Sequence, residues 1–162
     1  MIVSLDSPDR ADVTALLSEH LRDMRAGSPA CSVHALDVTA LLAPSITFVT
    51  AREPGPDGAT LLGCGALSEL DAHHGELKSM RTATGARGRG VATAVLGHLL
   101  GVARERGYER VSLETGSQDS FAPARRLYAR HGFVECGPFG SYVEDPYSVF
   151  MTLPLPGPHV RA

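Results

Sequence analysis

The stretch Lys78-Ser-Met-Arg-Thr-Ala-Thr-Gly-Ala-Arg-Gly-Arg-Gly-Val-Ala92 joins an alternating, strand-like segment to a long helical segment through a loop rich in glycine and arginine. Gly88 and Gly90 remove side chains where backbone amides can approach a ligand, and Arg87 and Arg89 add positive charge where the helix dipole begins. The first N–H groups of a helix have no intrahelical partners and point outward, which suits phosphate. The stretch therefore predicts an anion-binding loop, with a pyrophosphate as the expected guest.

Spacing excludes two common phosphate-binding loops. A P-loop needs Gly-x-x-x-x-Gly-Lys-[Ser/Thr], but Lys78, the only lysine of the chain, lies on the wrong side of the loop. A dinucleotide fingerprint needs Gly-x-Gly-x-x-Gly, and Thr93 takes the place of the third glycine. The pattern that fits is Arg-x-x-Gly-x-Ala at Arg87, Gly90 and Ala92, which resembles the acyl-CoA pyrophosphate loop of the GNAT acyltransferase superfamily.

Length and composition predict one globular domain. The chain has 162 residues, of which 43% are hydrophobic and 20% charged, enough for a proper core. We expect a single domain over residues 1–153 and a loose, proline-rich tail over residues 154–162. The sequence has neither a run of about 18 apolar residues nor an N-terminal signal pattern, so we expect a cytoplasmic protein without a membrane partner.

Charge and cysteine usage narrow the expected partners. The formal net charge of -3 argues against nucleic acid as a partner. Cys31, Cys64 and Cys136 form no Cys-x-x-Cys pair, which predicts reduced thiols and neither a disulfide framework nor a metal site. His73 and His74 are adjacent, and adjacent strand residues point to opposite faces, so we expect no metal there either. We expect the protein to be a monomer or a homodimer.

Hydrophobic periodicity and turn residues predict the order strand, helix, three strands, helix, strand, helix, two strands. The expected strands cover residues 2–5, 45–52, 60–70, 75–82, 109–115, 133–136 and 148–153. The expected helices run from Pro8 to about Arg25, from Val91 to Gly107 and from Phe121 to His131, with a short helical turn within residues 35–42.

This order and several long stretches resemble the GNAT superfamily over nearly the whole chain. The segment 124–133 looks like its closing helix with a Gly-Phe exit. A closer likeness is to a subgroup of small bacterial N-acetyltransferases, carried by Ser-Val-His-Ala-Leu-Asp (32–37), Gly-Cys-Gly-Ala-Leu (63–67), Leu-Glu-Thr-Gly (113–116), Phe-Ala-Pro-Ala-Arg (121–125) and Asp-Pro-Tyr-Ser-Val-Phe-Met (145–151).

The resemblance implies an α/β fold, called α+β in some schemes, of three layers around a mixed, mainly antiparallel sheet of about seven strands. It also implies an acyltransferase that moves the acetyl group of acetyl-CoA to the amine of a small molecule or a peptide. The expected mechanism is direct attack in a ternary complex, without a metal.

The cofactor residues also follow from the resemblance. In the family the strand before the glycine loop separates from its neighbour, so Met80 and Thr82 should offer main-chain contacts, with the Met80 N–H close to the thioester oxygen. Phe121 stands where many relatives have an asparagine, so the contact there must differ. The predicted cofactor residues are Met80, Arg81, Thr82, Arg87, Gly88, Arg89, Gly90, Val91, Ala92, Thr93, Phe121 and Tyr128.

Two residues are predicted to move protons. Glu76 stands eleven positions before Arg87, a spacing at which some GNAT enzymes place a general base, although it could instead pair with Arg81. Tyr128 matches the position from which many GNAT enzymes protonate the departing CoA thiolate, and the Leu-Tyr-x-x-x-Gly-Phe context favours this role, although a tyrosine on such a helix is commonly a core residue.

The acceptor is expected opposite the cofactor, bound by His34, Asp37, Tyr142 and Asp145, although loop acids and aromatics are also common on ordinary surface.

The sequence leaves three alternatives open. Acetyl transfer could pass through a covalent intermediate on Cys64 or Cys136. The domain could bind acyl-CoA as a regulatory module without turnover. The tract 87–90 could bind RNA, which two arginines in an acidic chain support poorly.

Overall fold

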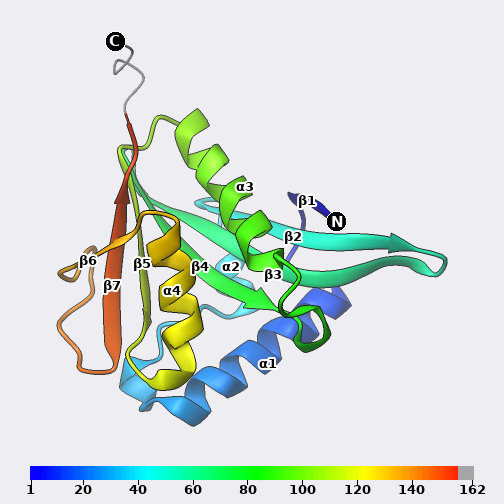
Figure 1. The fold of residues 1–162 in the computed structure, drawn as a ribbon, viewed down its shortest axis with the longest axis horizontal. Helices are drawn as coiled ribbons and strands as arrows, with labels where there is room; N and C mark the ends of the chain where they lie inside the picture. The colour runs from blue at the N-terminus through cyan, green and yellow to red at the C-terminus, as the bar shows by residue number, and fades with distance from the viewer. Residues whose placement is uncertain (157–162) are drawn as a thin grey trace.

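Seven strands pair in one open sheet in the computed structural model, which describes residues 1–156 (Figure 1). The sheet order is β1-β2-β3-β4-β5-β7-β6. β4 and β5 run parallel, and the other neighbouring pairs are antiparallel, so the prediction of a mixed, mainly antiparallel sheet is confirmed. The strands are β1 (Ile2–Leu5), β2 (Ile46–Gly55), β3 (Gly58–Asp71), β4 (His74–Thr82), β5 (Arg110–Gly116), β6 (Val134–Cys136) and β7 (Ser148–Pro154).

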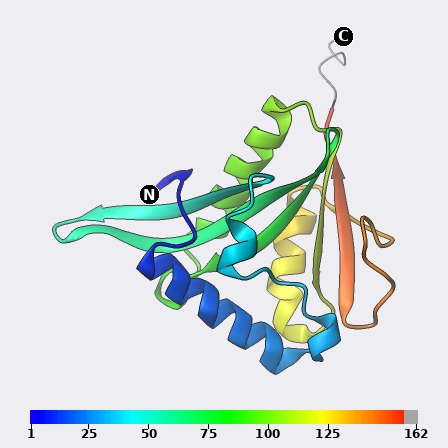
Figure 2. The same ribbon diagram turned by 180° about the vertical axis from the view of Figure 1, so that it is seen from behind.

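Helices cover both faces of this sheet, which gives the three predicted layers. α3 (Val91–Glu105) and α4 (Ala122–Arg130) lie on one face, and α1 (Ala11–Gly27) and the short α2 (Val38–Leu41) lie on the other (Figures 1 and 2). Each face has its own apolar core. The stripe predicted for α3 packs onto the sheet through Val91, Val95 and Leu99, and Val13, Leu16 and Leu17 of α1 pack on the opposite side.

Several predicted ends of elements differ from those in the structure. α1 begins at Ala11, because residues 8–9 form a turn and Arg10 is the N-cap. The β2–β3 hairpin extends further than predicted, because the strands continue to a tight turn between Gly55 and Gly58. At the C-terminus β7 continues to Pro154 and Leu155 is buried, and the rest of the predicted tail, residues 157–162, lies outside the described residues, so the loose tail stays a prediction.

Over residues 1–156, the helices are too short or too polar to cross a bilayer. In the same part of the chain, the His, Cys, Asp and Glu side chains form no group of three that could hold a metal ion.

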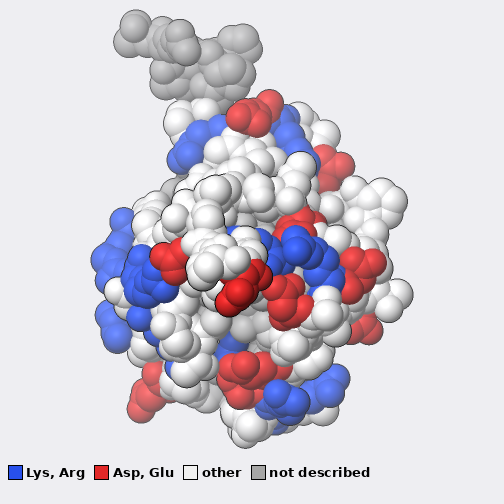
Figure 3. Space-filling view, turned by 90° about the vertical axis from the view of Figure 1, so that its right-hand side faces the viewer, with Lys and Arg blue, Asp and Glu red and all other residues white. Residues whose placement is uncertain are grey.

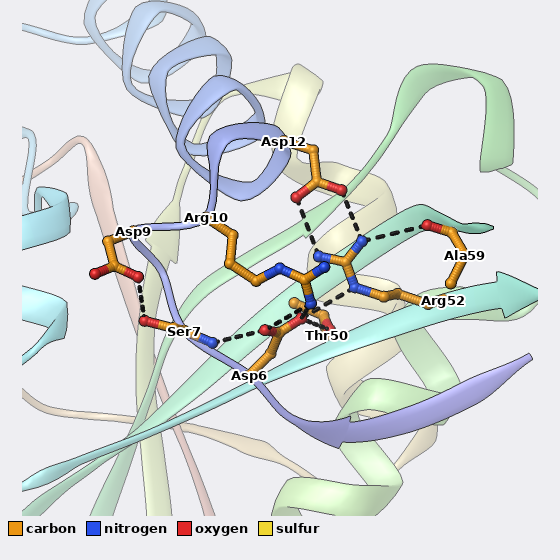
Figure 4. Close-up of polar contacts among 8 residues, drawn as sticks. All are labelled: Asp6, Ser7, Asp9, Arg10, Asp12, Thr50, Arg52 and Ala59. Atoms are coloured by element: carbon orange, nitrogen blue, oxygen red, sulfur yellow. Dashed lines mark hydrogen bonds and ion pairs between the residues drawn. The ribbon is translucent and has the colours of Figure 1, made fainter. Parts of the chain in front are cut away.

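A buried arginine joins the start of α1 to β2 (Figure 4). The Arg52 guanidinium donates to Asp6 at 3.0 Å and to Asp12 at 2.6 Å. Asp6 also accepts from the Thr50 hydroxyl at 2.7 Å and from Arg10 at 3.2 Å. Burial alone would raise the pKa of Asp6, but these hydrogen bonds and one from a backbone N–H bring it down to about 2. Asp6 is therefore a carboxylate at neutral pH and depends on its donors.

We expect Arg52→Met to lower the free energy of unfolding by about 3 kcal/mol, because it leaves the Asp6 carboxylate, 9% exposed, without its buried cation. Arg10→Met is the matched control. The Arg10 side chain is 55% exposed, so its loss should cost less than about 1 kcal/mol. Urea denaturation of both variants measures the difference. Equal losses would mean that Arg52 contributes no more than a surface ion pair.

Candidate active site

The central opening of the sheet lies where β4 and β5 separate. These strands pair only from His74–Arg110 to Leu77–Leu113, although β4 continues to Thr82 and β5 to Gly116. At the same point β4 carries one more residue than β3 between paired positions, which is a β-bulge, and Ser79 takes a φ of 55°. The bulge turns β4 away from β5, so the predicted separation of this strand is present.

A groove of about 940 Å³ and a smaller cavity of about 110 Å³ meet at this opening. Both are lined by the side chains of Met80, Phe121, Ala124 and Tyr128, together with His20 and Met24 of α1. The groove continues to the glycine loop, and the cavity continues between β4 and β5. The arrangement provides a long site and a small site that share one junction.

The glycine loop forms the far end of the groove. Gly88 and Gly90 have φ values of 76° and 77°, and Gly90 is the N-cap of α3. A Cβ added to either glycine would meet no protein atom within 4 Å, so both positions face open space. The predicted cofactor residues that line the groove are Met80, Arg81, Thr82, Arg87, Gly88, Gly90, Val91, Ala92, Thr93, Phe121 and Tyr128.

Arg89 is the predicted cofactor residue that does not line the groove. Its guanidinium instead donates to Glu53 of β2 at 2.8 Å. On the side of the molecule towards which the β2–β3 hairpin extends, basic and acidic side chains are interspersed (Figure 3). This distribution and the Glu53 partner give no support to the RNA-binding alternative, which requires a continuous basic surface.

Arg81 does not pair with Glu76, as the alternative interpretation of Glu76 supposed. Its guanidinium contacts Glu19 at 2.7 Å and Asp23 at 2.6 Å on α1, and so fastens this helix over β4. Spacing along β4 could not reveal these partners, because both acids come from a helix about sixty residues earlier.

Glu76 lies in the small cavity and forms an ion pair with Lys78, which was not predicted as a site residue. Its Oε2 accepts a hydrogen bond from the Tyr142 hydroxyl at 2.5 Å and contacts Lys78 Nζ at 3.2 Å. Lys78 also donates to the Tyr142 oxygen at 3.0 Å. The three side chains form a compact polar cluster beside the opening.

A second carboxylate, Glu114 of β5, lines the same cavity and was also missed. Its Oε2 accepts a hydrogen bond from the Ser148 hydroxyl at 2.9 Å. Burial raises the pKa of Glu114 to about 7, against smaller lowering effects of Ser148 and Lys78. Burial also lowers the pKa of His20 to about 4, with a further contribution from Arg81, so this histidine is neutral at physiological pH.

Tyr128 stands at the junction of groove and cavity. The residue is 6% exposed, and its ring packs edge-on against Phe133 with centroids 5.7 Å apart. Burial raises the pKa of its hydroxyl well above the usual value, so the proton stays on oxygen through the physiological range. Tyr128 therefore packs in the core and also reaches the site, so the two interpretations of this residue are compatible.

Of the four predicted acceptor residues, the structure brings two into the cavity. His34 and Tyr142 line it, with ring centroids 4.9 Å apart. Asp37 does not, because its Oδ1 caps α2 by accepting from the Ala40 N–H at 2.9 Å. Asp145 does not line it either. Its carboxylate accepts from the Ser32 hydroxyl at 2.6 Å and from the backbone N–H two residues later.

The cysteines do not have the environment of nucleophiles. Burial raises the pKa of the Cys64 thiol to about 12, and the S–H donates to the Ser79 carbonyl at 3.3 Å. Burial also raises the pKa of Cys136, which lines neither the groove nor the cavity. Because the thiolate is the nucleophilic form, the covalent alternative is disfavoured.

The acetyltransferase (GNAT) family model matches residues 13–133, three quarters of the chain, so the protein belongs to the GNAT family. It is by class an N-acetyltransferase, an acyltransferase whose acyl donor is acetyl-CoA.

At least three curated relatives match almost the whole chain. An uncharacterized N-acetyltransferase of Bacillus subtilis, YsnE, is 51% identical over 96% of this chain and 100% of its own length. The IAA acetyltransferase of Azospirillum brasilense is 36% identical over 94% of this chain and 97% of its own length.

Among solved structures, a protein of Klebsiella pneumoniae provisionally assigned as an acyl-CoA N-acyltransferase matches with a TM-score of 0.75 and 27% identity, over 95% of this chain and 97% of the other. A GNAT acetyltransferase of Elizabethkingia anophelis with acetyl-CoA bound matches with a TM-score of 0.65, over 95% and 97% of the two chains. At 14% identity this second match shows the fold alone.

Proposed function

We propose that the protein transfers the acetyl group of acetyl-CoA to a primary amine of a small molecule, by direct attack in a ternary complex. The observation that carries the proposal is the meeting of the large groove and the small cavity at Met80 and Tyr128. A groove that begins at an anion-binding loop suits the nucleotide and pantetheine arm, and it would deliver the thioester to the junction. The cavity would hold the acceptor.

The glycine loop would hold the pyrophosphate. Gly88 and Gly90 leave space for close approach, and the first turn of α3 offers unpaired N–H groups beside Arg87. The bulge at Ser79 changes the direction of the backbone immediately before Met80. The Met80 N–H is then our candidate for stabilising the oxyanion that forms on the thioester carbonyl.

In the proposed reaction the amine nitrogen attacks the thioester carbonyl, the new C–N bond forms and the C–S bond breaks. The amine must first lose a proton, and the carboxylates of the cavity are the candidates to take it, Glu76 being the one that the sequence predicts. Tyr128, which remains protonated, would give its proton to the departing thiolate. Metal chemistry has no part in this scheme.

The size of the cavity suits a small amine or the amine-bearing end of a larger acceptor, and it is too small for a peptide backbone. Its volume of about 110 Å³ is below that of engineered cavities of roughly 150 Å³ that take benzene, so only a short segment around the amine would be enclosed. His34 and Tyr142 would contact this segment. The remaining part of a larger acceptor would lie outside the cavity.

The test is a screen of primary amines, including 2-phenylethylamine, 1,4-diaminobutane, glycinamide and a lysine-containing peptide, that follows release of free CoA from acetyl-CoA. We expect amine-dependent release with small amines and little with the peptide, and mass spectrometry should find the acetylated product. If the protein binds acetyl-CoA but releases no CoA with any of the amines, the proposal is overturned and the alternative of a non-catalytic acyl-CoA-binding module is favoured.

A further inference from the structure

The small cavity contains two carboxylates on the same face of the sheet. Residues paired across parallel strands point to the same face, and the register places Glu76 opposite Ser112 and Leu77 opposite Leu113. Continued by one residue, this register brings Lys78 level with Glu114. Glu76, Lys78 and Glu114 therefore face one another across the opening, and all three line the cavity.

Resting on the proposed function, the geometry points to Glu114 as the general base that takes the proton of the acceptor ammonium, with Glu76 as the carboxylate that positions this ammonium. Glu76 already balances a charge. Its partner Lys78 has a side chain only 11% exposed, and Glu76 is its single ion-pair partner among residues 1–156. A proton on Glu76 would leave this buried ammonium uncompensated, which is costly.

Glu114 is in the opposite situation. In the described part of the chain it takes part in no ion pair, and its one side-chain hydrogen bond comes from the neutral Ser148 hydroxyl. Protonation of Glu114 therefore removes a buried charge instead of creating one. Its second oxygen, Oε1, has no hydrogen-bond donor within residues 1–156 and is available to an acceptor. The raised pKa of about 7 agrees with this role, because a base works best when its pKa lies near the working pH.

The charged and titratable groups that face Glu114 come from several elements. Lys78 and Glu76 lie on β4, and Tyr142 and Asp145 lie on the segment between β6 and β7. His20 and His34 line the same cavity from α1 and from the segment before α2. Lys78 lowers the pKa of Glu114 and the two acids raise it, but burial has the largest effect, so the base should titrate near neutrality.

Protons balance in this scheme. One proton passes from the ammonium to Glu114 and then to solvent, which leaves a neutral amine for attack on the thioester carbonyl. The nitrogen loses its second proton when the tetrahedral adduct collapses. Tyr128 protonates the CoA thiolate, and this second proton restores Tyr128. The products are the amide, the CoA thiol and one proton released to solvent.

The decisive measurement is kcat/KM from pH 5.5 to 9.5, with the best amine of the screen, for the wild type, Glu114→Gln and Glu76→Gln. For the wild type we expect kcat/KM to rise with pH up to about 7, as Glu114 loses its proton, and then to reach a plateau. Glu114→Gln should lose about 10²- to 10⁴-fold at pH 7 and show no plateau, its rate rising until the amine deprotonates without help. Glu76→Gln should keep the rise near pH 7 and increase the KM of the amine.

Two control variants and one direct titration test the assignment of Glu114. Glu135→Gln, at an exposed glutamate of β6, should keep the wild-type profile. Glu114→Asp, which restores a carboxylate, should recover part of the lost rate. Carbon-13 NMR of the glutamate carboxyls, with circular dichroism to confirm folding, should show a group that titrates near pH 7 and is missing in Glu114→Gln.

The outcomes separate the two proposals. The assignment of Glu114 would be overturned, and the proposed function left intact, if the wild type transfers acetyl groups and Glu114→Gln keeps the wild-type pH profile. The same holds if the increase of kcat/KM near pH 7 is lost in Glu76→Gln alone. The absence of any glutamate titrating near pH 7 would also overturn it. If the wild type acetylates none of the amines in the screen, both the assignment of Glu114 and the proposed function are overturned.

Discussion

Gly90→Val should weaken binding of CoA by about 100-fold or more while the protein stays folded. Gly90 is the N-cap of α3, lines the groove and has open space where a side chain would project. A branched side chain there would occupy the position proposed for pyrophosphate oxygens and would separate them from the N–H groups of the first turn. Loss of two charge-assisted hydrogen bonds is worth about 3 kcal/mol, which corresponds to roughly 100-fold in the dissociation constant.

The backbone of Gly90 needs its own control, because valine at a φ of 77° is strained wherever it stands. Gly107, beyond the other end of α3, has a φ of 75°, has no atom near a built Cβ and does not line the groove. Gly90→Val and Gly107→Val should therefore lose similar stability, about 1 to 2 kcal/mol for one left-handed position. Calorimetric titration with CoA should show a loss of affinity in the first variant alone. Equal affinities would mean that the loop does not hold the pyrophosphate.

The fold was largely predictable because its signals are local. The apolar stripe of α3 and its glycine exit at Gly107 are present as predicted. Alternation and turn residues gave the strands and their order, and the resemblance to the GNAT superfamily gave the sheet. The errors lie at the ends of elements. The predicted helix start at Pro8 is an example, because a turn and the first turn of a helix favour the same residue types.

The polar partners inside the site were not predictable, because they depend on how distant segments meet. Glu114 lies in an alternating strand, where a polar residue usually faces solvent, and it faces a cavity only because β4 leaves β5 at that level. That departure coincides with the β-bulge at Ser79, a non-glycine residue whose positive φ has no signal in the sequence. Asp37 is different, since an aspartate just before a short helix is a recognisable N-cap that the sequence could have revealed.

Tyr128→Phe should lower kcat by about 10²- to 10⁴-fold, the usual effect of removing one general acid, with little loss of stability. Burial is the one effect that shifts the pKa of the hydroxyl, with no side-chain hydrogen bond contributing within residues 1–156, and the ring contact with Phe133 is kept in the variant. What the variant removes is the proton donor at the junction where the CoA thiolate would leave. Because burial raises the pKa of Tyr128, the wild-type donor stays protonated, and the deficit should persist from pH 6 to 9.5.

This persistence distinguishes Tyr128 from Glu114, whose variant should recover as the amine deprotonates at high pH. Tyr108→Phe is the matched control. Tyr108 is also buried, but its hydroxyl donates to Glu69 at 2.8 Å and it lines neither the groove nor the cavity, so its loss should reduce stability and leave kcat unchanged. Full activity of Tyr128→Phe across the pH range would reduce Tyr128 to a packing residue. The departing thiolate would then take its proton from the amine or from water, and the enzyme would act through positioning of its two substrates.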